Sequence, residues 1–292
     1  MKQLVILSGK GGTGKTSITA SLGALTAECV MADCDVDAAD LHILTDADGR
    51  HSEPFSDQVL ARVVSDRCTR CGRCEKACRF DAIHLPAEGE AALVERLSCE
   101  GCGLCHDLCP EGAIVLEERL SGELLVSRGS FGPLVHARLG PGEGNSGKLV
   151  SLVRERAKEI AERSGLDLVL LDGSPGVGCP VIASLTGVDL VLLVTEPSLA
   201  GIHDLERIMD LLDHFRLPGR VMVNKHDLNP RLSERIDELC DRREKPLIGR
   251  IPFDPRFTEA MVAGRPITTW CPESPAARTI AEAWESLQAD LE

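Results

Sequence analysis

The chain has 292 residues, of which 43% are apolar and 27% charged, and its formal net charge is −14. This composition is typical of a globular protein and excludes a disordered chain. The acidic balance disfavours constitutive binding to nucleic acid or acidic lipid, because binding to both draws on positive charge. No apolar run approaches the roughly 20 residues of a membrane span, and the N-terminus reads as strand and loop rather than as a cleaved signal peptide. We therefore expect a cytoplasmic protein with no membrane anchor.

The first motif follows the apolar run Leu4–Leu7 and precedes a helix-like segment, Ser17–Thr26. Strand, glycine-rich loop and helix in this order are the context of a phosphate-binding loop. Its glycines let backbone N–H groups surround a triphosphate, and the helix start adds partial positive charge. We expect Lys15 to reach the β- and γ-phosphates and Thr16 to hold Mg²⁺. The residues predicted to bind ATP in this loop are Gly9, Lys10, Gly11, Gly12, Thr13, Gly14, Lys15, Thr16 and Ser17.

Acidic residues end two further predicted strands. The strand near 29–32 is followed by Asp33 and Asp35, and the apolar strand 166–171 is followed by Asp172 and a glycine-rich loop. Carboxylates at the carboxyl ends of parallel strands lie where such a sheet binds its ligands. The loop after Asp172 is expected to move with the γ-phosphate. The predicted Mg²⁺ ligands are Thr16, Asp35 and Asp172, and Lys15 is predicted to be catalytic.

Cysteine occurs 13 times, and most of these residues lie in two runs with the spacing Cys-x₂-Cys-x₂-Cys-x₃-Cys. In bacterial ferredoxins this spacing binds [4Fe–4S] clusters, with the fourth cysteine of each run serving the other cluster. Zinc, the alternative, needs four cysteines per site in two pairs and fits these spacings badly. The predicted ligands are Cys68, Cys71, Cys74 and Cys109 for cluster 1, and Cys78, Cys99, Cys102 and Cys105 for cluster 2.

The two cysteine runs continue into a repeat, since residues 78–85 match residues 109–116. This internal duplication indicates a two-cluster ferredoxin. Arg79 stands where the second run has Pro110. We hypothesise that this cation raises the reduction potential of the cluster that Cys78 ligates.

Lys10 completes the sequence Lys-Gly-Gly-Thr-Gly-Lys-Thr, which resembles the deviant Walker A loop of the MinD/ParA/nitrogenase-iron-protein ATPases. The resemblance implies a homodimer, or a heterodimer with a related ATPase, in which Lys10 reaches the phosphates of the partner's nucleotide. It also implies that Lys10 and Asp35 are catalytic together with Lys15, that Asp35 positions the attacking water, and that Asn224 contacts adenine. Guanine is the alternative base, because Asn224, Lys225 and Asp227 match the Asn-Lys-x-Asp motif of GTPases, but the Lys10 loop favours ATP.

Two further features resemble the nitrogenase iron protein. The loop 140–148 resembles the loop that carries its intersubunit cluster cysteine, but Asn145 stands in that place here. We expect this loop to cap a helix at 149–163 through Asn145 or Ser146. Cys179 lies where the iron protein has a ligand, but a small buried thiol is the favoured interpretation.

The predicted fold is an α/β P-loop NTPase with a mostly parallel sheet flanked by helices, formed by residues 1–57 and 119–292. An α+β two-cluster ferredoxin domain is expected to interrupt it at residues 58–118. Residues 45–57 are expected to form a polar linker out of the sheet. Residues 114–127 are expected to form two strands joined by a turn at Ser121-Gly122.

The sequence predicts a Mg²⁺-dependent, partner-stimulated ATPase that couples nucleotide-driven dimerisation to electron transfer, or to metallocluster assembly or delivery on a partner protein. Its predicted cofactors are ATP, Mg²⁺ and two [4Fe–4S] clusters. The alternative is a MinD/ParA-like positioning or scaffold ATPase whose clusters are redox sensors or structural. A third hypothesis, an electron carrier with a vestigial nucleotide site, is disfavoured by the complete set of Lys15, Thr16, Asp35 and Asp172.

Overall fold

The computed structural model describes residues 1–86, 89–140 and 147–292, so the predicted caps Asn145 and Ser146 lie outside the described residues. The chain divides into two compact units. The first comprises Met1–Glu53, Leu124–Arg138 and Asn145–Glu292, and the second comprises Pro54–Glu123 and Leu139–Gly144. The boundaries predicted at 57/58 and 118/119 fall inside strands β3 (Asp48–Val63) and β6 (Ile114–Gly129), which both units share.

The described strands form a nine-stranded sheet in the order β11-β10-β9-β1-β8-β2-β7-β6-β3. Neighbouring strands pair in parallel from β11 through to β7. The mostly parallel α/β sheet predicted from the sequence is thus confirmed. The bounds of these strands are β1 Lys2–Leu7, β2 Val30–Asp33, β7 Gly132–Leu139, β8 Leu168–Asp172, β9 Leu190–Thr195, β10 Gly219–Asn224 and β11 Leu247–Ile251.

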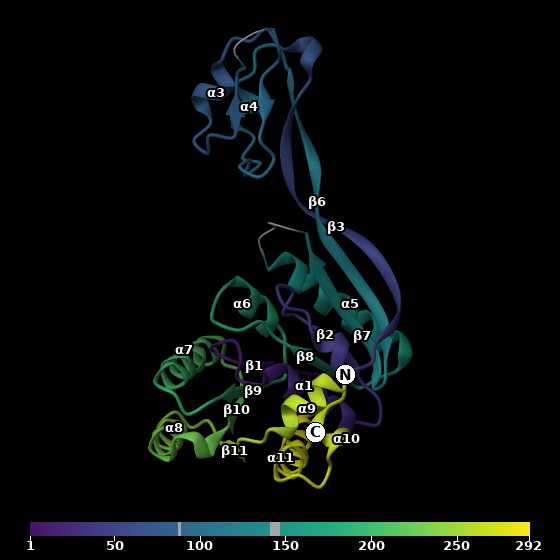
Figure 1. Ribbon diagram of the computed structural model, residues 1–292, viewed down its shortest axis with the longest axis vertical. Helices are drawn as coiled ribbons and strands as arrows, with labels where there is room; N and C mark the ends of the chain where they lie inside the picture. Colours follow the sequence, from purple (N-terminus) through teal and green to yellow (C-terminus); the bar gives the residue numbers. More distant parts are fainter. Residues whose placement is uncertain (87–88, 141–146) are drawn as a thin grey trace. The chain divides into compact units, whose positions relative to one another are not determined.

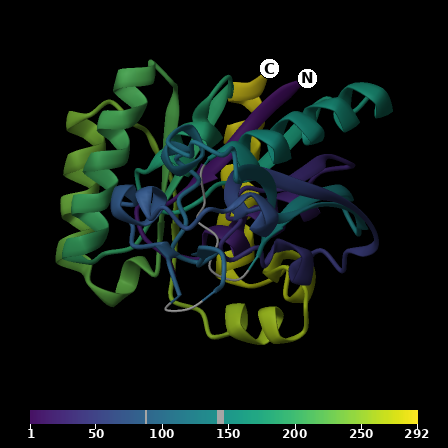
Figure 2. The same ribbon diagram turned by 90° about the horizontal axis from the view of Figure 1, so that it is seen from above.

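The sheet is buried on both faces at its centre. In β1, Leu4 and Ile6 join a core cluster with Ile18 of helix α1, while the alternate residues Val5 and Leu7 are just as completely buried. Because successive side chains of a strand point to opposite faces, helices must cover both. Helix α1 packs against α10 and α11, α5 packs against α6, and α7 packs against α8 (Figures 1 and 2).

The helices of the first unit follow their strands in the order expected of a doubly wound fold. Their bounds are α1 Lys15–Leu25, α2 Leu41–Leu44, α5 Lys148–Ser164, α6 Cys179–Leu185, α7 Leu199–Phe215, 3₁₀ helix η2 His226–Leu228, α8 Pro230–Arg242, α9 Arg256–Val262, α10 Ile267–Trp270 and α11 Pro275–Leu291. Among the described residues, none of the chain's helices is long and apolar enough to cross a bilayer.

The second unit repeats one local structure twice. Glycine in the left-handed conformation precedes each short helix, with φ of 70° at Gly72 and 79° at Gly103. A later cysteine sulfur accepts a backbone N–H: Ala82 donates to Cys78 (3.4 Å) and Ala113 donates to Cys109 (3.2 Å). The elements are 3₁₀ helix η1 Ser65–Arg67, α3 Arg73–Ala77, α4 Leu104–Asp107 and the antiparallel strands β4 Ile83–His84 and β5 Leu93–Val94.

Two predictions about the connections are wrong. Residues 48–57, expected within a linker, belong to strand β3, which is the last strand of the sheet. Pro54 is tolerated there because an edge strand has one side without ladder hydrogen bonds. Strand β6 runs unbroken through Ser121 and Gly122, and the chain turns instead at residues 130–131 into β7. Gly140, directly after β7, donates its N–H to the carbonyl of Ser121 (2.9 Å), so this end of β6 is held extended against the turn propensity of the pair.

Candidate nucleotide site and cysteine cavities

The predicted nucleotide residues meet at the carboxyl edge of the parallel sheet. The glycine-rich loop follows β1, and the register places Ile6 of β1 opposite Asp172 of β8. Asp172 in turn lies opposite Asp33 of β2. This edge is where open α/β sheets bind their ligands.

Asp172 is the centre of the predicted Mg²⁺ site. Thr16 Oγ1 donates a hydrogen bond of 2.7 Å to Asp172 Oδ2, and Thr19 Oγ1 donates one of 2.9 Å to Asp172 Oδ1. Lys15 Nζ lies 2.9 Å from Asp172 Oδ1 and 3.6 Å from Asp35 Oδ2. The structure therefore brings Lys15, Thr16, Asp35 and Asp172 together, as the sequence predicts.

The buried charges of this site shift one another's pKa values. Burial alone would lower the pKa of Lys15, but Asp172, Asp35 and Asp33 outweigh it and raise that pKa above its ordinary value. Burial is also the first cause that raises the pKa of Asp35, against the opposing charge of Lys15. Burial and the neighbouring Asp172 raise the pKa of Asp33 well above its usual range. Asp33 accepts the backbone N–H groups of Asp35 (3.1 Å) and Leu41 (3.0 Å), so it shapes the loop after β2.

Two buried polar groups test whether this site fits a nucleotide. Within the described residues, the buried Thr13 Oγ1 has no hydrogen-bond partner, and the buried Lys15 Nζ contacts only the carboxylates of Asp172 and Asp35. Leaving a buried donor without a partner costs about 1–3 kcal/mol. Phosphate oxygens would satisfy both groups, and the oxygens of Thr16 and Asp172 are of the type that Mg²⁺ prefers. The residues present therefore fit a Mg²⁺-nucleotide.

Asn224 supports the phosphate loop. Its Nδ2 donates to the carbonyl of Thr13 (2.7 Å), and its Oδ1 accepts the N–H of Lys225 (2.9 Å). Gly14 has φ of 93°, and a Cβ there would lie 2.5 Å from Asn224 Nδ2, so only glycine fits. The predicted contact of Asn224 with adenine stays a prediction.

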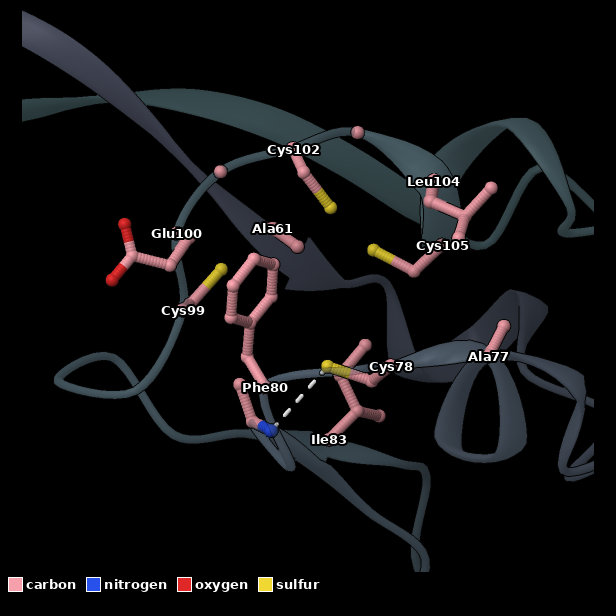
Figure 3. A pocket seen from close by; sticks show the side chains of 13 residues that line it. Ala61, Ala77, Cys78, Phe80, Ile83, Cys99, Glu100, Cys102, Leu104 and Cys105 are labelled. Carbon is pink, nitrogen blue, oxygen red and sulfur yellow. Dashed lines mark hydrogen bonds between the residues drawn. The ribbon is translucent and has the colours of Figure 1, made fainter.

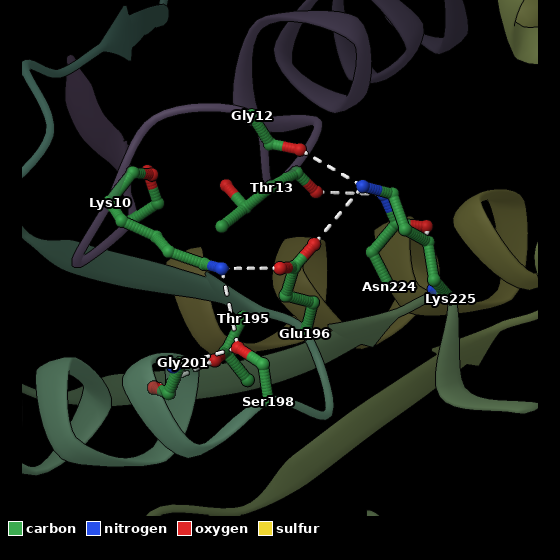
Figure 4. A network of polar contacts seen from close by, with 10 residues as sticks. Lys10, Gly12, Thr13, Thr195, Glu196, Ser198, Gly201, Asn224 and Lys225 are labelled. Atoms are coloured by element: carbon green, nitrogen blue, oxygen red, sulfur yellow. Dashed lines mark hydrogen bonds and ion pairs between the residues drawn. The ribbon is translucent and has the colours of Figure 1, made fainter. Parts of the chain in front are cut away.

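Lys10 contacts its own subunit in this structure (Figure 4). Its Nζ forms an ion pair with Glu196 and donates to Ser198 Oγ at 3.2 Å. Lys225 Nζ lies 3.0 Å from the other oxygen of Glu196 and donates to the carbonyl of Gly12 at 3.0 Å. Burial alone would raise the pKa of Glu196, but the two lysines outweigh it and lower that pKa.

Glu196 and Thr19 were not predicted as site residues, and Lys225 was named only in the alternative guanine motif. Glu196 follows the buried strand β9 directly, so the rule that pointed to Asp172 could have found it. Thr19 lies one helical turn after Lys15, and its Oγ1 also bonds the carbonyl of Lys15 at 3.0 Å. Such a helical threonine usually has only this local role, and nothing in the sequence shows that Asp172 is its second partner.

Two cavities among the described residues of the second unit are lined by cysteines. The sulfurs of Cys78, Cys99, Cys102 and Cys105 turn toward a shared interior, with the ring of Phe80 beside them (Figure 3). The first cavity is lined by Cys68, Cys71, Cys74 and Cys109, and the second by Cys78, Cys99, Cys102 and Cys105. The cysteines group as the sequence predicts, with the fourth cysteine of each run in the cavity of the other.

The spacing of these side chains tests which metal group they fit. Across residues 1–86, 89–140 and 147–292, no three His, Cys, Asp or Glu side chains converge closely enough for a single metal ion. A structural zinc needs four ligands about 2.0–2.3 Å from one ion. A [4Fe–4S] cluster instead takes one thiolate at each of four separate irons, so its four ligands lie farther apart. Four cysteines line each cavity, and four thiolates are the donor set of a [4Fe–4S] cluster, so the residues present fit this group.

The cysteines outside these cavities differ in exposure. Cys29, Cys34 and Cys240 are buried, and Cys271 is partly buried. Cys179 is exposed at the start of helix α6, so its interpretation as a buried thiol is wrong. Gly178 and Pro180 flank it, and this helix start leaves its side chain outside the core.

Comparison with known proteins identifies the family of the chain and several similar proteins. Residues 4–267 match the family model of the CobQ/CobB/MinD/ParA nucleotide binding domain. An uncharacterized protein of Methanocaldococcus jannaschii is 35% identical over 231 residues, covering 78% of this chain and 79% of that protein. An uncharacterized ATP-binding protein of the same organism is 24% identical over 292 residues, covering 96% and 84%.

Solved structures of MinD share the fold. MinD in the MinC:MinD complex of Aquifex aeolicus has a TM-score of 0.58 at 18% identity, covering 99% of this chain and 96% of that chain. MinD of Pyrococcus horikoshii complexed with Mg-ADP has a TM-score of 0.54 at 18% identity, covering 98% and 95%. This chain belongs to the CobQ/CobB/MinD/ParA nucleotide-binding family and has the ATPase fold of its MinD/ParA members.

Proposed function

We propose that this protein is a Mg²⁺-dependent ATPase in which ATP-driven pairing of subunits is coupled to electron transfer, or to metallocluster delivery, through two [4Fe–4S] clusters. The observation that carries the proposal is a unit with two four-cysteine cavities inserted into an ATPase sheet. Strands β3 and β6 enter and leave that unit, and both belong to the sheet that carries the nucleotide loop. A movement of the sheet on nucleotide binding could therefore be transmitted along β3 and β6 to the unit that carries the cysteines.

The nucleotide side of the proposal uses residues that already contact one another. Lys15 neutralises the β- and γ-phosphates, and Thr16 and Asp172 hold Mg²⁺. Asp35 orients the attacking water, from a position where its carboxylate faces Lys15. Lys10 leaves its own subunit to reach the nucleotide of the partner, which is either a second copy or a related ATPase.

The cysteine sets would hold one cluster each, and a bound cluster supplies one-electron transfer. The N–H groups of Ala82 and Ala113 that donate to Cys78 and Cys109 would stabilise the thiolates there. The partner that receives the electron, or the cluster, is a redox or metallocluster protein.

A MinD/ParA-like positioning or scaffold ATPase is the second candidate, with clusters that sense redox state or stabilise the fold. The membership of the chain in the MinD/ParA family favours it. It predicts the same nucleotide chemistry but no effect of the nucleotide on cluster reduction.

Anaerobic purification and redox titration separate the candidates. Two clusters predict about eight iron and eight sulfide atoms per chain. Coupling predicts that Mg-ATP changes the midpoint potential or chelator reactivity of at least one cluster, since linkage between two sites is reciprocal. Full iron content with no change on adding ATP would support the second candidate. Material with neither iron nor ATP-dependent phosphate release would overturn both.

A further inference from the structure

Lys10 forms an ion pair with Glu196 of its own subunit. The ion pair with Glu196 joins the start of the phosphate loop to the residue after β9, and Ser198 at the start of α7 accepts a second bond from the same ammonium (Figure 4). The Lys10 side chain is 31% exposed and that of Glu196 18%, so the pair lies where a side chain can move without disturbing the core.

If Lys10 moves away, Glu196 and Ser198 each keep another contact. Glu196 retains Lys225 at 3.0 Å, and Lys225 is itself held by the carbonyl of Gly12. Ser198 Oγ continues to accept the N–H of Gly201 at 3.0 Å, as the N-cap of α7. Departure of Lys10 therefore leaves no buried group unpaired, which would otherwise make release costly.

We propose that Glu196 is a resting-state anchor for Lys10, an autoinhibitory contact that must break before ATP can pair two subunits. One ammonium cannot occupy Glu196 and the nucleotide of a partner at once, so every pairing event competes with this contact. Glu196 is a positioning residue that sets how much nucleotide and protein are needed for pairing. The inference rests on the proposed function only in that ATP pairs the subunits through Lys10.

The expected size of the effect follows from the exposure of the pair. A partly exposed ion pair contributes modestly, and two such contacts break in a symmetric dimer. Removing the charge of Glu196 should therefore tighten ATP-dependent pairing roughly fivefold to thirtyfold. The variant Glu196→Gln keeps the size of the side chain, so the fold should be retained.

Sedimentation velocity over a series of protein concentrations, with Mg²⁺ and a non-hydrolysable ATP analogue, measures the pairing. Glu196→Gln should lower the dimer dissociation constant by that factor, whereas Glu206→Gln should leave it unchanged. Glu206 is exposed on α7, the helix that follows Glu196, and provides the same change in charge. Lys10→Ala should itself weaken pairing, so its residual dimerisation is measured at higher protein concentration. There Glu196→Gln should have no effect, because the competing lysine is gone. An effect of equal size in that background would overturn the proposal and assign the effect to Lys225.

Amine labelling of nucleotide-free protein tests the anchor without dimerisation. Glu196→Gln should increase acylation of Lys10 several-fold, as measured by peptide mass spectrometry, and Glu206→Gln should not. Wild-type protein that stays monomeric with ATP would contradict the proposed function, while the labelling would still decide whether Glu196 holds Lys10. Unchanged labelling, or increased labelling with unchanged pairing in a protein that does dimerise, would overturn the anchor.

Discussion

The hydroxyl of Thr16 donates to Asp172, a residue 156 positions further along the chain, at a distance of 2.7 Å. This bond joins the first turn of α1 to the end of β8. It brings the hydroxyl and the carboxylate of the predicted Mg²⁺ site into direct contact. Lys15 lies beside the same carboxylate, so the residues predicted to bind phosphate and Mg²⁺ meet at one acidic side chain.

Replacing that carboxylate with an amide should stop hydrolysis. Asp172→Asn keeps the size of the side chain but removes the negative charge that Lys15 contacts and that is predicted to bind Mg²⁺. We expect the rate of phosphate release to fall by roughly a hundredfold or more. Binding of ATP measured by calorimetry without Mg²⁺ should change much less. Asp213→Asn, on the exposed surface of α7, is the control, and equal rates for the two variants would contradict this role of Asp172.

The cysteine cavities predict which ligands act together. Cys78 and Cys99 lie in different runs of the sequence but line one cavity (Figure 3). Cys78→Ser and Cys99→Ser should therefore each lose about four iron atoms and the same electron paramagnetic resonance signal. The double variant should lose no more than either single one.

Cys109→Ser should instead abolish the other signal, because Cys109 lines the cavity of the first run. Cys271→Ser, outside both cavities, should keep all the iron. Loss of one signal in Cys99→Ser and of the other in Cys78→Ser would show that each run holds its own cluster, contrary to this grouping.

Arg79 should tune one cluster only. Its guanidinium lies 5.0 Å from the centre of the Phe80 ring, and Phe80 lines the cavity of Cys78. A cation near a cluster favours the reduced, more negative form, so Arg79→Ala should lower that midpoint potential. Since Arg79 is exposed, the change should not exceed about 40 mV. A redox titration followed by electron paramagnetic resonance resolves the two midpoints, and Lys76→Ala on the exposed surface of α3 is the control. Equal shifts of both midpoints would contradict a local effect of Arg79.

Buried thiols should resist alkylation at mildly alkaline pH. Burial raises the pKa of Cys29 to about 11 and that of Cys240 to about 12. Because the thiolate is the reactive form, both should remain unmodified by iodoacetamide at pH 8 in the folded protein. The exposed Cys179 should react under the same conditions.

The same pKa values predict how stability depends on pH. A thiol whose pKa is raised by folding stabilises the protein fully below its unfolded pKa, near 9, and this contribution is lost as pH rises toward the folded value. Thermal unfolding should therefore occur at lower temperature as pH increases above 9, and less steeply in Cys240→Ala than in wild type. Rapid labelling of Cys240 at pH 8 in folded protein would contradict its burial.

The sequence alone determined the chemistry that depends on local spacing. The phosphate loop is one short segment between a strand and a helix, and the cysteine runs carry their own repeat. The resulting predictions for Lys15, Thr16 and the cysteine groups required no knowledge of how strands are ordered. The apolar strands also predicted the parallel sheet, because burial on both faces leaves continuous hydrophobic runs.

Only the tertiary structure decided what lies beside these motifs. The contact of Lys10 with Glu196 depends on β9 being a neighbour of β1 in the sheet, and the second bond of Thr19 depends on β8 being the other neighbour. Ser121 and Gly122 continue a strand that lies between β7 and β3 in the sheet. Strand order is set by long-range packing between segments far apart in the chain, so the spacing of residues within a short motif does not determine it.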